Sequence, residues 1–454
     1  MTRAVTVVGG GLAGCEAAVR LARAGHRVRL VEMRPIRTTE AHQTGRLGEL
    51  VCTNSFKSEA PENAHGQLKR EMRALGSVLL RSADAARVAA GSALAVDRGI
   101  FSMAMTAAVE AEPSIEIVRE ECTKIPEGPC IIATGPLTSG ALYDAMEATL
   151  GDGGLAFFDA IAPIVHRDSL DESIVFEQGR FDEDADYLNC PMNRAEYDAF
   201  VEALDAGEGH EGHDWDHVPY FEGCLPIEVM ASRGKETLRF GPMKPIGLTV
   251  PDTGERPWAV VQLRREDRGG QMWNMVGFQT RLKTGEQRRI FTMIPGLADA
   301  EFLRWGSIHR NSYLNFPERL TAHGALPARP DVLFAGQLTG VEGYTESAAS
   351  GILAGINLGR TLEGRAAVVP PPTTMLGGLM RYLRDATAGR FQPMNSNWGL
   401  VDPLSQRVRD KKEKRHVLAR RAQDDFLAWM ADTGLELAAD ASGPRGTASA
   451  TTDG

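Results

Sequence analysis

The chain has 454 residues, 43% of them hydrophobic, and a formal net charge of −10 at pH 7. This length corresponds to roughly three domain-lengths, and the composition is that of a globular protein with at least one large core. The acidic balance disfavours a general nucleic-acid binder. No apolar run approaches the roughly 18 residues that would cross a bilayer, and the N-terminus has no signal-peptide cleavage pattern, so we expect a cytoplasmic protein without a membrane segment.

The first predicted elements form a β-α-β unit. AVTVV at 4–8 is a short β-rich run, small and apolar residues recur at helical spacing over 13–24, and RVRLVE at 27–32 is the next strand. Gly25 supplies a helix C-cap. The spacing therefore predicts a strand, a helix and a second, parallel strand.

A glycine fingerprint occupies the first turn of this unit. Gly9, Gly11 and Gly14 fit the pattern G-x-G-x-x-G, and Glu32 ends the second strand. Such glycines let the backbone approach a pyrophosphate at the positive end of a helix, and the carboxylate accepts ribose hydroxyls. The unit predicts a dinucleotide site, for which NAD and FAD both remain open.

The stretch ELVCTNSFKSE at 49–59 places Cys52 among hydrogen-bonding side chains, unlike a buried structural thiol. None of the six cysteines forms a C-x-x-C pair, so we expect free thiols. Cys52 has no nearby cysteine with which to form a redox pair, which disfavours disulfide-reductase chemistry. An amphipathic helix is predicted over 63–80.

Two later segments favour FAD over NAD. CIIATGP at 130–136 and DVLFAGQLTGVEGYTESAASG at 331–351 resemble secondary FAD motifs of glutathione-reductase-like flavoproteins. A helix starting near Thr345 can direct its positive end at an isoalloxazine ring. No second nicotinamide-binding fingerprint is evident in the sequence.

The fold class expected is α/β: a glutathione-reductase-like, Rossmann-type FAD-binding domain with an α/β insertion domain. We place the FAD-binding domain at 1–95 and 236–440, the insertion mainly at 96–235, and a disordered tail at 441–454. WAVVQL at 258–263 and MWNMVGF at 272–278 are predicted strands within the second part.

Cys224 is a second thiol in a polar turn, between Gly223 and Leu225. Lys57, Arg233 or a helix beginning near Ile227 could each favour its thiolate, and the sequence does not choose among them. The stretch GHEGHDWDH at 209–217 is rich in potential metal ligands, but its spacing fits no zinc module, so no metal is predicted.

A basic segment lies near the C-terminus. Residues 405–421 hold eight Lys or Arg against Asp410 and Glu413, a local charge of +6 on an acidic body. Such a helix could hold phosphates, or it could simply be a solvated face.

The chain resembles the folate- and FAD-dependent tRNA (uracil-5-)-methyltransferases over about residues 4–420. The resemblance rests on GGGLAGCEAA, T-x-x-A-H at 38–42, ELVCTNSFKS, LKREMRALGS, GCLPIEVMASRG, LRFGPMKPIGL, VVQLRRED, VGFQTRLKTGEQ, FTMIPGL, HRNSYLN, AGQLTGVEGYTES and FQPMNSNWGL. It implies methylation of the T-loop uridine in the T-arm of tRNA, with 5,10-methylenetetrahydrofolate as carbon donor and FAD, reduced by NADPH or NADH, as reductant. No obligate protein partner is evident.

The same resemblance implies roles for residues. Cys224 corresponds to the nucleophile that adds to uracil C6, and Cys52 to the flavin-side cysteine that moves the C5 proton. Tyr344 and His309 are candidates for the folate pocket, with Arg281 or Lys283 for the folate carboxylates. The expected cofactor contacts are Gly9, Gly10, Gly11, Leu12, Ala13, Gly14, Glu32, Thr134, Gly135, Gly336, Gln337, Tyr344 and His309.

Four alternatives stay open. The same chemistry could act on a uridine of ribosomal RNA, because surface shape decides which RNA is bound. A larger wobble-uridine-modifying flavoprotein shares the glycine-rich opening, although it is longer and works with a GTPase. The chain could also be an FAD oxidoreductase acting on a small molecule, or a non-catalytic RNA-binding flavoprotein.

Overall fold

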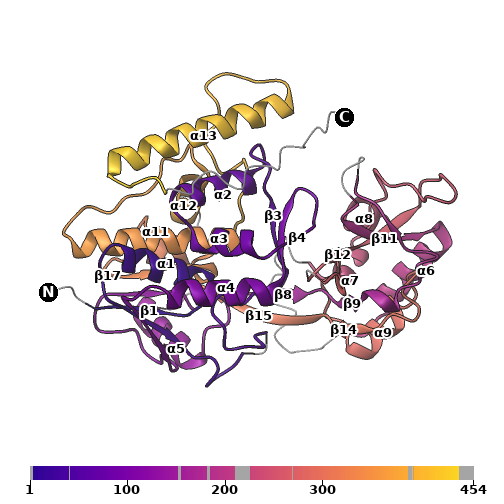
Figure 1. Cartoon of the computed structure of the whole chain (residues 1–454), viewed down its shortest axis with the longest axis horizontal. Coiled ribbons are helices and arrows are strands. Elements are labelled where there is room, and N and C mark those ends of the chain that lie inside the picture. The colour runs from indigo at the N-terminus through magenta and orange to yellow at the C-terminus, as the bar shows by residue number, and fades with distance from the viewer. Residues whose placement is uncertain are drawn as a thin grey trace, which may run out of the picture.

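The computed structural model describes residues 4–39, 41–151, 155–180, 185–209, 225–267, 269–386, 391 and 393–438, without the side chains of 155–161, 307–312 and 318. Figure 1 shows two lobes, a larger one that carries both ends of the described chain and a smaller one built from its middle. Two long strands, β8 (Leu155–Ile161) and β15 (Ser307–Tyr313), pair antiparallel where the lobes meet. No helix of the described residues has the length and apolarity to cross a membrane.

A six-stranded sheet forms the centre of the larger lobe. Its order is β16-β17-β7-β1-β2-β6, and the five strands from β17 to β6 run parallel. The strands are β1 (Val5–Val8), β2 (Val28–Glu32), β6 (Ile115–Arg119), β7 (Cys130–Ile132), β16 (Ala325–Leu326) and β17 (Arg329–Phe334). Thr6 and Val332 both pair with Cys130, so segments from the two ends of the chain share one sheet, as predicted.

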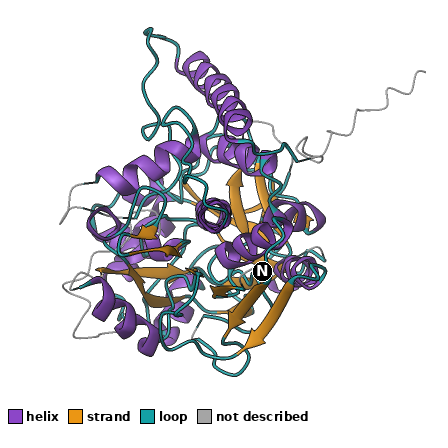
Figure 2. Cartoon of the chain, turned by 90° about the vertical axis from the view of Figure 1, so that its left-hand side faces the viewer, coloured by secondary structure: helices purple, strands orange, loops and turns teal. Residues whose placement is uncertain are grey.

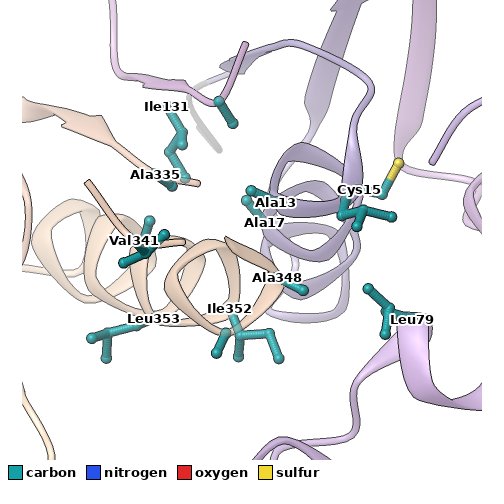
Figure 3. Packing of buried hydrophobic residues seen from close by; sticks show 14 of the residues in the cluster. Ala13, Cys15, Ala17, Leu79, Ile131, Ala335, Val341, Ala348, Ile352 and Leu353 are labelled. Carbon is teal, nitrogen blue, oxygen red and sulfur yellow. The ribbon is translucent and has the colours of Figure 1, made fainter. Parts of the chain in front are cut away.

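Helices α1 (Leu12–Arg23) and α11 (Tyr344–Leu362) pack closely against each other beside this sheet. Figure 3 shows α1, which carries Ala13 and Ala17, packed beside α11, which carries Ala348 and Ile352, in the apolar core. A Cβ added at Gly351 would lie 2.2 Å from the Ala13 carbonyl oxygen. The small residues therefore allow backbone-to-backbone contact between elements distant in the sequence.

The rest of the larger lobe surrounds this pair (Figure 2). A three-stranded sheet, β3-β5-β4, lies at its border with the smaller lobe (Figure 1). The strands of this sheet are β3 (Ser55–Ser58), β4 (Arg87–Val88) and β5 (Ala93–Val96). The other helices of the larger lobe are α2 (Ala64–Ala74), α3 (Val78–Ala85), α4 (Arg98–Glu110), α5 (Gly140–Leu150), α10 (Phe316–Arg319), α12 (Met375–Asp385) and α13 (Lys411–Thr433).

The smaller lobe contains an antiparallel sheet with its own apolar core. Its strand order is β10-β11-β12-β13-β9-β14. The strands are β9 (Ile164–His166), β10 (Phe176–Glu177), β11 (Tyr187–Met192), β12 (Ala259–Arg265), β13 (Met272–Met275) and β14 (Phe302–Arg304), with helices α6 (Arg194–Asp205), α7 (Ile227–Ser232), α8 (Thr237–Phe240) and α9 (Thr284–Phe291).

The division between the two sheets differs from the predicted limits at 95 and 235. β6 and β7, placed in the insertion by the sequence analysis, belong to the parallel sheet with β1. β12, β13 and β14, placed in the FAD-binding domain, belong to the smaller lobe. An apolar run indicates a strand but does not indicate which distant strand it pairs with.

The single helix predicted over 63–80 was also wrong. Gly76 has φ +75° after α2 ends, and the Ser77 side chain accepts a hydrogen bond from the Leu80 amide to start α3. The helical periodicity continues across this break, because both short helices bury apolar residues in the same core.

The α1–α11 contact predicts a large cost for one methyl group. Gly351→Ala should lower the free energy of unfolding by about 1–3 kcal/mol, because the added Cβ meets backbone that cannot move aside cheaply. Gly285→Ala in α9 is the matched control. Its Cβ meets nothing within 4 Å, so it should be neutral or stabilise by up to about 1 kcal/mol. Denaturant unfolding of both variants measures this, and equal effects would contradict the packing argument.

Candidate functional site

The turn between β1 and α1 forms an open cradle. Gly9 has φ +102°, and a Cβ there would lie 2.6 Å from the Ala133 carbonyl oxygen. A Cβ at Gly14 would lie 1.8 Å from the Gly9 oxygen. Gly11, by contrast, is the N-cap of α1 and has open space before it, so the positive end of the helix is accessible to a pyrophosphate.

Glu32 at the end of β2 is held by two groups. Its Oε2 accepts a hydrogen bond from the Gly10 amide at 2.8 Å, and Arg34 donates Nε to Oε1 at 2.9 Å and Nη2 to Oε2 at 3.1 Å. Burial alone would raise the pKa of Glu32, but Arg34 and the Gly10 amide outweigh it and lower the pKa. Arg34 is itself buried and also donates to Glu49 at 3.1 Å. Glu32 is thus an ionised, oriented carboxylate.

Two cavities meet beside this turn. The smaller, about 70 Å³, is lined by Gly9, Gly11, Glu32, His42 and Thr134, among others. The larger, about 270 Å³, lies between the lobes. Leu137 lines both, so the two cavities adjoin. The residues of the larger cavity used below are Cys52, Lys57, Arg264, Gln337, Glu342, Tyr344 and Glu346.

The segment that contains Cys52 is fixed on several sides. The Tyr344 hydroxyl accepts the Cys52 amide at 2.7 Å and the Thr53 amide at 3.2 Å. Arg98 donates to the Cys52 carbonyl at 2.8 Å. From the smaller lobe, Arg264 donates to Thr53 Oγ1 at 2.7 Å. The backbone is therefore immobilised while Cys52 lines the cavity.

The other described cysteines occupy different surroundings. Cys15, Cys130 and Cys190 are buried, and burial raises the pKa of Cys130 and of Cys190 to about 12. Cys122 is half-buried, lines the smaller cavity, and also has its pKa raised by burial. Among the described cysteines, only Cys52 lines the larger cavity.

Comparison with known proteins places the chain in a family. Residues 4–366 match the family model described as "GIDA: Glucose inhibited division protein A". The chain is 54% identical over 434 residues, 95% of this chain and 100% of the relative, to methylenetetrahydrofolate–tRNA-(uracil-5-)-methyltransferase TrmFO of Geobacter sulfurreducens. It is 55% identical to the protein of the same name from Rhodospirillum rubrum, over 94% of this chain and 92% of the relative. The chain belongs to the GIDA family and, within it, to the TrmFO methyltransferases.

The fold agrees with this assignment. The structure of Aquifex aeolicus GidA matches with a TM-score of 0.67 at 16% identity, covering 94% of this chain and 73% of that chain. The predicted glutathione-reductase-like fold class with a second α/β unit is confirmed. The open glycine cradle and the oriented Glu32 fit the ADP part of FAD, and the adjoining larger cavity has room for further groups.

The residues expected to contact cofactor in this TrmFO-family chain fall into three groups. Gly9, Gly11, Glu32 and Thr134 line the smaller cavity, and Gln337 and Tyr344 line the larger one. Gly10 donates its amide to Glu32, and Gly14 packs against the Gly9 carbonyl. Ala13 meets Gly351 of α11, and Leu12 is buried in the core. Gly135 and Gly336 adopt positive φ at the ends of β7 and β17, where Gly336 donates its amide to Ser350 Oγ at 2.7 Å.

Several expectations concern side chains the structure does not describe. Cys224 and the His-rich stretch lie outside the described residues, and His309 is described only as backbone of β15, paired with Asp159. Among the described side chains, no group of three or more His, Cys, Asp or Glu could hold a metal. Lys283 pairs with Glu208 at 3.0 Å, and Arg281 lies 3.8 Å from Glu228, and neither lines the described part of the larger cavity.

Sequence reasoning missed the buried charges that support the site. Arg34 and Arg98 bind carboxylates or carbonyls beneath the two cavities, and Glu346 lines the larger cavity at the start of α11. Glu266, the carboxylate partner of Arg98, is distant in the sequence. No local pattern could have identified that pair, although Glu346 lies inside a segment that the sequence analysis had already singled out.

Removing the Arg34 cation beside Glu32 should lower the free energy of unfolding by an amount that depends on pH. Arg34→Met should destabilise the protein by about 3–5 kcal/mol near pH 7, because Glu32 and Glu49 lose the charge between them. Glu32 has a lowered pKa in the native protein, so its contribution is present above its ordinary value of 4.5 and is lost as pH falls through the lowered value. In the variant Glu32 protonates more easily, so the deficit should shrink towards pH 4.

Thermal unfolding at several pH values measures this deficit. Arg29→Met removes an exposed pair with Glu120 and is the control, with an expected effect within about 0.5 kcal/mol at every pH. A deficit for Arg34→Met that stays constant or grows towards pH 4 would show that Glu32 does not depend on this cation.

Proposed function

We propose that this protein methylates C5 of the T-loop uridine of tRNA, taking the carbon from 5,10-methylenetetrahydrofolate. FAD, held at the β1–α1 turn and reduced by NADPH or NADH, would supply the reducing equivalents. The observation that carries the proposal is the position of Cys52 in a cavity that adjoins the dinucleotide cradle. The names of the relatives, which match nearly the whole chain, support the substrate and the carbon donor.

The chemistry requires an activated uracil, because its C5 is a poor nucleophile. In this proposal the Cys224 thiolate adds to C6, which makes C5 nucleophilic towards the methylene carbon. Once the carbon is joined to C5, Cys52 would take the C5 proton as the carbon–nitrogen bond to folate breaks and tetrahydrofolate leaves. Cys224 would leave from C6 after the methylene group that remains on C5 has been reduced. FAD, when bound, would supply the two electrons that convert the methylene group into a methyl group.

The described contacts suit Cys52 to a proton transfer. Tyr344 and Arg98 hold its amide and carbonyl, so the thiol of Cys52 keeps one position relative to the cavity. The start of α11 adds the positive end of a helix to the same wall. We place the folate ring against Tyr344, with His309 as the second proposed contact.

The RNA would be held in part by the start of α13. Residues 411–416 of this helix are all exposed, and they include four Lys or Arg. The Asp410 side chain accepts the Glu413 amide at 2.7 Å and caps the helix, so the cations are presented on an ordered turn. An otherwise acidic protein needs such a localised contact for phosphates.

A trapping experiment should distinguish the roles of Cys224 and Cys52. A tRNA carrying 5-fluorouridine at the target position lets the thiolate add to C6 but blocks loss of the C5 substituent, so a covalent adduct accumulates. Cys224→Ala should abolish this adduct, and Cys52→Ala should still form it, while neither variant methylates normal tRNA. Denaturing gel electrophoresis measures the adduct, with Cys190→Ala as the control for a buried thiol. The reverse pattern would exchange the two roles, and an adduct in both single variants would refute the mechanism.

The basic helix should control affinity through salt-dependent contacts. Reversing the charges of Lys411, Lys412 and Lys414 to Glu should weaken tRNA binding and reduce the slope of log K against log salt by about 2–3, because up to three phosphate contacts are lost. Filter binding at several salt concentrations measures both quantities. Reversal of Lys235, Arg194 and Arg256, which are exposed in the smaller lobe, is the control. Unchanged affinity and slope for the α13 variant would place the phosphate contacts elsewhere, such as Arg265, Arg288 and Arg289.

A further inference from the structure

Lys57 occupies a strained position in the wall of the larger cavity. Its φ is +63°, and it is the one non-glycine residue with positive φ in the described part of the chain. The register between β3 and β5 shifts between Ser55 and Ser58, which makes an irregularity around Lys57. This backbone region costs an ordinary side chain roughly 1–2 kcal/mol, and it persists only where the surroundings impose it.

The surroundings do impose it. The Lys57 amide donates to Ser55 Oγ at 3.1 Å, and the next residue, Ser58, accepts the Lys69 ammonium on its carbonyl at 2.9 Å. Lys69 is buried and belongs to α2. Irregularities of this kind next to a site redirect a side chain, and here Lys57 is exposed and lines the cavity.

Glu346 is the counter-charge of Lys57 in the same wall. Its carboxylate is fully buried at the start of α11, accepts the Ser396 amide at 2.9 Å and lies 3.3 Å from His65 Nδ1. Burial alone would raise the pKa of Glu346, but His65 and the charge of Lys57 lower it well below its ordinary value. The wall therefore carries an ionised carboxylate, which interacts with Lys57, His65 and the buried Lys69.

The other charged residues of the cavity are already engaged. Arg264 donates Nε to Asn54 Oδ1 at 3.1 Å and Nη2 to Thr53 Oγ1 at 2.7 Å. Glu342 accepts the Gln337 amide group at 2.9 Å. Lys57 Nζ makes no hydrogen bond to a described residue, so of the two cations in this lining it is the one whose charged group remains available to a bound molecule.

We infer that Lys57 stabilises the reduced form of the flavin by placing its ammonium in the larger cavity, opposite the negative charge of Glu346. The inference rests on the proposed function, which holds FAD at the β1–α1 turn, and we place its flavin ring in the larger cavity that adjoins this turn. Uptake of two electrons and one proton leaves one negative charge on the ring. Without a cation the buried Glu346 would oppose that charge, and with Lys57 the pair is electrically balanced before reduction.

The test measures the midpoint potential of the bound flavin and its affinity for sulfite, rather than the methylation rate. Lys57→Asn removes the charge, and Asn tolerates the left-handed backbone, so the fold should be kept. The equilibrium constant for two-electron reduction of bound FAD should fall about tenfold, which corresponds to a midpoint potential ~30 mV lower. Affinity for sulfite, which adds to the ring and leaves a negative charge there, should fall about tenfold. Lys57→Arg should restore both values to within about threefold.

Two further variants keep the result decisive. Glu346→Gln removes the opposing charge and should shift both quantities in the opposite direction, which decides the matter even if Lys57→Asn binds FAD poorly. Lys235→Met removes an exposed lysine paired with Glu202 and should change neither value. A potential and a sulfite affinity within twofold of wild type in Lys57→Asn, or no shift in Glu346→Gln, would overturn the inference. Failure of the wild-type protein to bind FAD would instead contradict the proposed function.

Discussion

The close contact between α1 and α11 is the constraint on which the rest of the structure depends. Gly351 meets the Ala13 backbone, and Gly355 lies beside Ala17, so no side chain separates the two helices there. This contact joins the segment after the glycine turn to the segment that carries Tyr344 and Glu346 (Figure 3). Because both helices begin beside the cavities, their positive ends are directed towards one site.

The second constraint is that residues from both lobes donate hydrogen bonds to, or accept them from, the segment that contains Cys52. Tyr344 and Arg98 act from the larger lobe, while Arg264 and Arg304 donate to Thr53 and Val51 from the smaller one. Hydrogen bonds to charged donors are stronger than neutral ones, so this segment should be among the more rigid loops. The function we propose needs that rigidity, because proton transfer requires a fixed distance.

The sequence predicted the parts of the fold that local patterns encode. The β-α-β unit, the glycine turn and the start of α11 were all predicted, since each depends on residues that are neighbours in the chain. The predicted domain assignment of β6, β7 and β12 to β14 was wrong, because pairing between distant strands leaves no local pattern in the sequence. Cys52 and Glu32 were singled out from their motifs, and each lines one of the two cavities. The burial of Arg34 and the left-handed backbone of Lys57 have no local sequence pattern and are visible only in the structure.

The central claim is that the carbon reaches uracil C5 from folate, with the flavin as reductant. Incubating the purified protein with methylenetetrahydrofolate labelled at its methylene carbon, NADPH or NADH, and tRNA lacking the T-loop methyl group tests it directly. After digestion, the account predicts label in 5-methyluridine at the T-loop position, and only when FAD is bound. Unlabelled tRNA in the presence of bound FAD and reductant, or label at a different nucleotide, would contradict it.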